Sequence, residues 1–102
     1  MPRSTRGALA PAARAIRQVA PGYPVRLVGV FGSVARGDEG PASDLDVVVL
    51  FDEGRTTRDV LGFCVDLEDA VGREVNLVTS LDGISAAFAS ELERDLVVAY
   101  ER

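Results

Sequence analysis

Two short valine-rich runs with polar motifs at their ends limit what this chain can fold into. Residues 25–31 read VRLVGVF and residues 44–51 read DLDVVVLF. Apolar runs of this length, rich in β-branched residues, predict buried β-strands. Gly32-Ser33 directly follows the first run, and the second run begins with an alternating Asp-Leu-Asp sequence. We therefore expect two strands that carry polar groups at their ends.

Helix and strand signals alternate along the rest of the chain. Thr56 and Asp59 form a capping-box-like pair at the start of one helix, and Gly72 fits its end. An Ala-rich amphipathic stretch is stopped by Pro21-Gly22. The expected helices cover residues 9–20, 57–71 and 83–94, and the expected strands cover residues 25–31, 44–51, 73–79 and 96–100. This order indicates an α/β domain with a small mixed β-sheet flanked by helices.

The composition excludes several classes of protein. A length of 102 residues leaves room for a single domain over residues 1–102, of which residues 1–8 are expected to fray. The net charge of −5 argues against direct DNA binding, which needs a basic surface. A single cysteine, Cys64, and the lack of histidine exclude an internal disulfide and the common zinc sites. We expect Cys64 in the core of a cytoplasmic protein with no membrane span.

Gly32-Ser33 is the first candidate for a ligand contact. A strand that ends in Gly-Ser at the start of a helical turn can direct backbone N–H groups toward a phosphate. The alternative is an ordinary turn in which Ser33 is the helix N-cap. Gly37 is expected to end the turn. Arg36 is a third candidate nucleotide contact, although we favour an ion pair with a nearby acid: Asp38, Glu39 or Asp44.

Asp44 and Asp46 are the second candidate. Residues two apart on a strand point the same way and lie roughly 6–7 Å apart along the chain. Their carboxylates repel each other by about 2–3 kcal/mol at an effective dielectric constant of about 20. Carboxylates without histidine or cysteine select Mg²⁺ or Mn²⁺ over zinc. The alternative is that both acids lie in solvent at a loop-to-strand boundary.

Together the two motifs predict one cleft. Phosphate-binding N–H groups would come from the end of one strand, and metal ligands would come from the start of its neighbour. Such a cleft can bind Mg²⁺ with a nucleoside triphosphate and position the α-phosphate for in-line attack by a hydroxyl group.

The composite motif resembles the signature of the minimal nucleotidyltransferases, the small members of the DNA polymerase β superfamily. It consists of Gly32-Ser33, ten intervening residues and then Asp44-Leu45-Asp46. The leading helix, the VARG turn and the later VNLVT strand also fit. The resemblance implies a polymerase β-like nucleotidyltransferase core over nearly the whole chain.

The resemblance also implies roles for single residues. Asp44 and Asp46 would be catalytic metal ligands, and Gly32 and Ser33 would hold the β- and γ-phosphates. Similar proteins carry a third acid on a later strand, as metal ligand and general base. This chain has Asn76 at that position.

Asn76 departs from the family pattern. A carboxamide cannot accept a proton and is a poorer ligand than a carboxylate. Glu74, two residues earlier, is one candidate for the missing acid; it is otherwise an exposed strand charge. The base could also come from the acceptor or from solvent.

Two functions follow as expectations. The resemblance implies transfer of AMP from ATP onto a hydroxyl of a partner protein, with the chain as antitoxin of a HEPN-type RNase toxin whose tyrosine is modified. The alternative is a catalytically degenerate module that binds nucleotide or neutralises a toxin by contact. A homo-oligomeric nucleotide sensor is a third, weaker interpretation.

Overall fold

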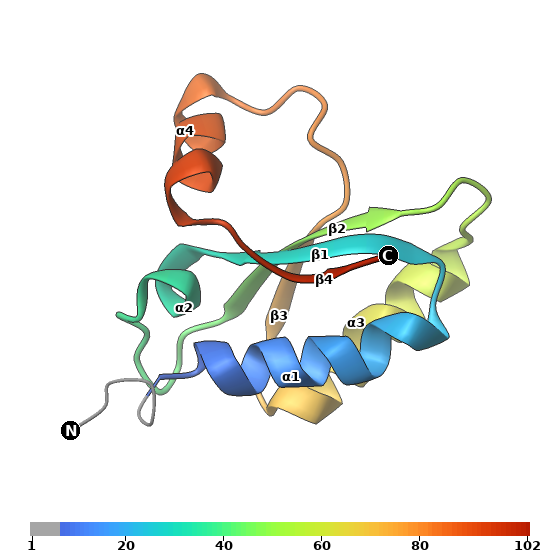
Figure 1. Ribbon diagram of the computed structural model, residues 1–102, viewed down its shortest axis with the longest axis horizontal. Coiled ribbons are helices and arrows are strands. Elements are labelled where there is room, and N and C mark those ends of the chain that lie inside the picture. Colours follow the sequence, from blue (N-terminus) through green and yellow to red (C-terminus); the bar gives the residue numbers. More distant parts are fainter. Residues whose placement is uncertain (1–6) are drawn as a thin grey trace.

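The computed structural model describes residues 7–102, which form a four-stranded sheet with helices on both faces (Figure 1). The strands are β1 (Val25–Phe31), β2 (Leu45–Phe51), β3 (Val75–Val78) and β4 (Val97–Glu101). The helices are α1 (Leu9–Val19), α2 (Gly32–Arg36), α3 (Thr57–Val71) and α4 (Ala86–Asp95), with a 3-10 turn, η2 (Ala20–Gly22), after α1. Fraying was predicted for residues 1–8, and the first six of these lie outside the described residues.

The sheet is mixed, as predicted from the alternation of elements. Its strand order is β3-β2-β1-β4. β1 pairs antiparallel with both β2 and β4, whereas β2 and β3 are parallel and are joined through α3. The register places Phe31 opposite Asp46 and places Asp46 opposite Asn76. The start of β2 is therefore adjacent to the end of β1 and to the start of β3.

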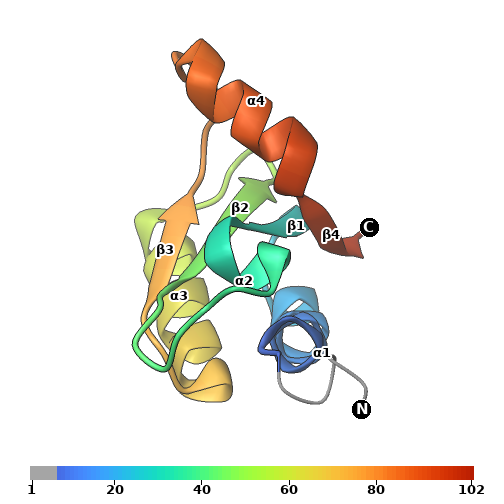
Figure 2. The ribbon, with the colours of Figure 1, turned by 90° about the vertical axis from the view of Figure 1, so that its left-hand side faces the viewer.

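The two faces of the sheet carry separate apolar clusters. α1 and α3 cover one face, and α4 crosses the other, as Figure 2 shows. The larger cluster under α1 and α3 includes Leu45, Val47 and Val49 of β2, whereas Val48 belongs to the smaller cluster under α4. Because side chains alternate along a strand, Asp46 points to the same face as Val48. The polar groups at the start of β2 thus lie on the α4 side.

Local sequence signals account for the helix boundaries. Thr56 and Asp59 form the predicted capping box, and Gly72 ends α3 in the left-handed conformation. α4 begins at Ala86, three residues later than predicted, because Gly83 has a φ of 75° and Ser85 is the N-cap. No helix among residues 7–102 is long and apolar enough to cross a membrane.

Cys64 packs against the larger apolar cluster, in agreement with its predicted place in the core. Burial raises the pKa of its thiol, and the nearby Glu68 carboxylate raises it further. A thiol held in its neutral form is a poor nucleophile, which fits a packing role.

Candidate functional site

Three polar side chains meet where β2 begins beside β3. Asp44 directly precedes β2, Asp46 is its second residue, and Asn76 is the second residue of β3. The Asn76 Nδ2 atom donates to Asp44 Oδ2 at 3.2 Å and to Asp46 Oδ1 at 3.0 Å. The structure therefore brings the two predicted carboxylates and the predicted third position into one cluster, here called the Asp–Asn cluster.

Gly32 lies directly against this cluster. Its φ is 75°, a conformation that side-chain-bearing residues adopt at a cost. A Cβ atom at Gly32 would also collide with the Asp46 carboxylate. Glycine is thus required both by the backbone conformation and by the close approach of Asp46.

Ser33 is the second residue of α2 and is not the helix N-cap, which is the extended residue Phe31. The alternative interpretation of Ser33 as an N-cap is therefore wrong, because the helix begins two residues earlier than that interpretation requires. No side chain of the described residues caps the start of α2. The first N–H groups of this turn consequently have no side-chain acceptor.

Arg36 is held by carboxylates. It bonds to Asp38 at 3.3 Å and to Asp95 of α4 at 3.1 Å, and it lies 3.9 Å from Glu91. The bonds to Asp95 and Asp38 raise the pKa of the guanidinium. The predicted pairing with Asp38 is present, whereas the link to α4 was missed because it joins residues 59 positions apart.

Glu74 does not join the Asp–Asn cluster. It precedes β3, and its backbone carbonyl accepts a hydrogen bond from the Leu45 N–H at 2.8 Å. Its side chain is exposed beside a hollow of about 500 Å³ lined also by Arg73. Within residues 7–102 no three acidic, histidine or cysteine side chains are grouped to hold a metal. In this structure Glu74 is therefore not grouped with Asp44 and Asp46 as a third acid.

The Asp–Asn cluster nevertheless suits a hard divalent cation. Its possible ligands are the oxygens of two carboxylates and one carboxamide, which is the ligand chemistry that Mg²⁺ and Mn²⁺ prefer. Both carboxylates already converge on a single donor, the Asn76 amide nitrogen. A cation that took its place would face the same two oxygens.

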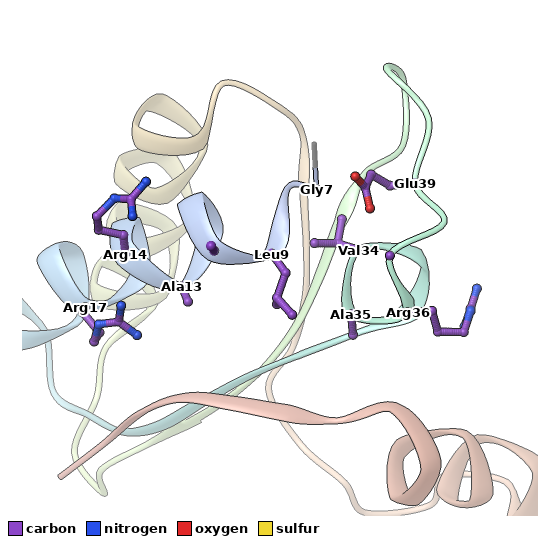
Figure 3. Close-up of a pocket in the computed structure, with 11 residues that line it drawn as sticks. Gly7, Leu9, Ala13, Arg14, Arg17, Val34, Ala35, Arg36 and Glu39 are labelled. Atoms are coloured by element: carbon purple, nitrogen blue, oxygen red, sulfur yellow. The ribbon is translucent and has the colours of Figure 1, made fainter. Parts of the chain in front are cut away.

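A separate groove of about 780 Å³ lies between α1 and α2 (Figure 3). It is lined by Leu9, Ala13, Val34 and Ala35, together with the arginines Arg14, Arg17 and Arg36 and the acid Glu39. Among the described residues, no acidic side chain forms an ion pair with Arg14 or Arg17. Sequence reasoning missed this groove, although two arginines three residues apart on one helix were a visible signal.

Comparison with known proteins places the chain in a family. The family model described as "Nucleotidyltransferase domain" matches residues 13–100. A proposed protein adenylyltransferase of Methanocaldococcus jannaschii is 36% identical over 55 residues. That alignment covers 54% of this chain and 59% of the relative, so the chain spans less than two thirds of the relative's length.

Solved structures with the same fold agree. One is described as a proposed minimal nucleotidyltransferase, with a TM-score of 0.68 and 33% identity, covering 95% of each chain. Another is a Shewanella oneidensis complex of a tri-AMPylated HEPN toxin with an MNT antitoxin, with a TM-score of 0.61 and 17% identity. The alignment covers 89% of this chain and 71% of the matched chain, and at this identity it shows the fold alone. By its sequence from residue 13 to residue 100 and by its fold, this chain belongs to the nucleotidyltransferase domain family, whose activity is nucleotidyl transfer.

Proposed function

We propose that this chain is a Mg²⁺-dependent nucleotidyltransferase that moves AMP from ATP onto a hydroxyl group of a partner protein. The observation that carries the proposal is the Asp–Asn cluster packed against the Gly32 turn. Family membership supports the reaction class, and the relative from M. jannaschii supports a protein acceptor. The toxin–antitoxin neighbour suggests a HEPN-type toxin as that acceptor, with this chain as antitoxin.

Each part of the site has a role in this reaction. Asp44 and Asp46 hold the cation, and the Gly32-Ser33 turn receives the β- and γ-phosphates. A cation held there would offset the negative charge of the triphosphate and polarise its α-phosphate. Because Asp46 touches Gly32, the cation ligands and the phosphate turn are fixed at contact distance. In the proposed reaction the acceptor oxygen attacks the α-phosphorus in line, and pyrophosphate leaves.

Asn76 restricts the choice of acceptor. Its carboxamide cannot take the proton that the hydroxyl loses, so that proton passes to solvent or to a base on the acceptor. A tyrosine phenol, with a pKa of about 10, ionises far more readily than a serine hydroxyl. The site therefore favours a tyrosine acceptor, as the resemblance to the toxin–antitoxin pairs implies.

The direct test is transfer of label. The purified chain, a HEPN-domain protein from the same organism, Mg²⁺ and α-labelled ATP are incubated together. The proposal predicts a labelled tyrosine on the partner, no label with EDTA and none with Asp46→Asn. If the wild-type protein labels neither protein nor RNA under these conditions, the proposal is wrong.

A second candidate function is neutralisation of a partner by contact alone. The groove between α1 and α2 favours it, because an apolar floor flanked by arginines suits an acidic amphipathic segment. A neutralisation assay in cells distinguishes the two functions. If contact suffices, Asp44→Asn still neutralises the toxin while Arg14→Glu with Arg17→Glu does not; if transfer is required, Asp44→Asn fails. Arg26→Glu with Arg58→Glu, at two exposed arginines outside the groove, controls for the same change of charge.

A further inference from the structure

We propose that the Asn76 carboxamide is a reversible clamp on the two aspartates. Its NH₂ group holds Asp44 and Asp46 together in the metal-free protein, and the carboxamide turns over to offer Oδ1 when a divalent cation enters. The inference deepens the proposed function and rests on its cation site, but it does not require nucleotide transfer.

The proposal starts from two hydrogen bonds between Asn76 and the aspartates. One nitrogen, Asn76 Nδ2, donates both of its hydrogens, one to each aspartate, at 3.2 Å and 3.0 Å. Two adjacent carboxylates repel each other, and a shared donor relieves that repulsion without a cation. A third carboxylate at this position would add repulsion in the same state.

A carboxamide can serve both states because its two ends differ. The nitrogen end donates hydrogen bonds, and the oxygen end accepts them or binds a metal. Rotation of the terminal torsion exchanges the two ends, and this torsion has a broad, roughly two-fold energy profile. Asn76 is exposed, so the rotation meets little packing resistance.

The aspartates have less freedom to move. Asp46 is fixed in the middle of the sheet opposite Phe31 and Asn76, and its carboxylate lies against Gly32. Asp44 is followed by Leu45, whose N–H is bonded to the Glu74 carbonyl. Entry of a cation is therefore accommodated by the Asn76 side chain rather than by the strands.

The sequence makes the clamp directly observable. Asn76 is the only asparagine and Gln18 the only glutamine in the chain, so a ¹⁵N–¹H NMR spectrum contains just two side-chain NH₂ signal pairs. Gln18 is exposed on α1 and serves as an internal control. Asn76→Ala assigns the pairs by removing one of them.

The clamp predicts three results at constant pH. In EDTA the Asn76 NH₂ protons exchange with water about tenfold more slowly than those of Gln18, because both Asn76 protons are hydrogen-bonded to aspartates. MgCl₂ moves the Asn76 pair and removes this protection, while the Gln18 pair stays in place. Substoichiometric MnCl₂ broadens the Asn76 pair beyond detection and leaves the Gln18 pair sharp.

Two results would overturn the inference. One is an Asn76 pair that exchanges as fast as Gln18 in EDTA. The other is an Asn76 pair that MgCl₂ and MnCl₂ leave unchanged up to millimolar concentration. AMP transfer is assayed separately: transfer with an unmoved Asn76 pair refutes the clamp alone, and a moved pair without transfer refutes the proposed function alone.

Discussion

At the scale of single residues, the site depends on how Asp46 is surrounded. Asn76 bonds to it from one side, and Gly32 leaves room for it on the other. Both neighbours are uncharged and small or polar, so the carboxylate keeps its position without a basic partner. Two substitutions test these neighbours separately.

Replacing Asn76 by Asp exchanges the donor for a third carboxylate. Asn76→Asp is expected to lower the melting temperature in EDTA by about 4–8 °C, since lost hydrogen bonds and added repulsion at this exposed site cost about 1 kcal/mol. The same substitution is expected to increase the stabilisation by MgCl₂. Thermal melts with and without MgCl₂ measure both effects, and a variant that responds to Mg²⁺ no more than the wild type would refute this view of the cluster.

Replacing Gly32 by Ala tests the close approach of Asp46. Gly37 provides a matched control, because its φ is 81° but no atom lies within 4 Å of a Cβ placed there. Gly37→Ala should cost about 1 kcal/mol of unfolding free energy for backbone strain alone. Gly32→Ala should cost more, and only Gly32→Ala should abolish nucleotide binding. Equal losses in denaturant melts, with ATP binding retained, would show that the contact with Asp46 is unimportant.

At the scale of elements, Arg36 ties α2 to α4. Its bond to Asp95 joins α2, which begins with Gly32-Ser33, to the helix that covers the same sheet face as Asp46. The Asp95 side chain is only 5% exposed. Burial would raise the pKa of its carboxyl, but hydrogen bonds from Arg94 and Arg36 outweigh burial and lower it.

This lowered pKa makes a prediction for the pH dependence of stability. The folded-state pKa of Asp95 lies below the unfolded value of about 3.9, so the unfolded state binds more protons in that interval. The stabilisation is present above about pH 4 and is lost as the pH falls through the folded-state pKa. In Asp95→Asn the melting temperature should fall less steeply as the pH is lowered through this acidic range. A pH dependence equal to that of the wild type would exclude Asp95 as a contributor.

At the scale of the whole molecule, the sequence determined the element order because the local signals agreed with the fold. The capping box at Thr56 and the valine-rich runs needed no long-range information. The pairing of Asp46 with Asn76 was also expected, since the resemblance placed both at one site. The sequence did not predict which distant segments lie against each other. Examples are the bond from Arg36 to Asp95 and the groove beside α1. These depend on which faces of α2 meet α1 and α4, and no local pattern encodes that.

The central claim is that the Asp–Asn cluster and the Gly32 turn form one Mg²⁺–nucleotide site. The most direct measurement is a thermal-shift titration with ATP alone, MgCl₂ alone and both together, for the wild type and Asp46→Asn. At about 100 times its dissociation constant a ligand adds about 2.7 kcal/mol, which is a shift of several degrees for a domain of this size. We predict that the full shift requires both ligands and disappears in Asp46→Asn. A wild-type melting curve that no combination moves, or an equal shift in the variant, would contradict the claim.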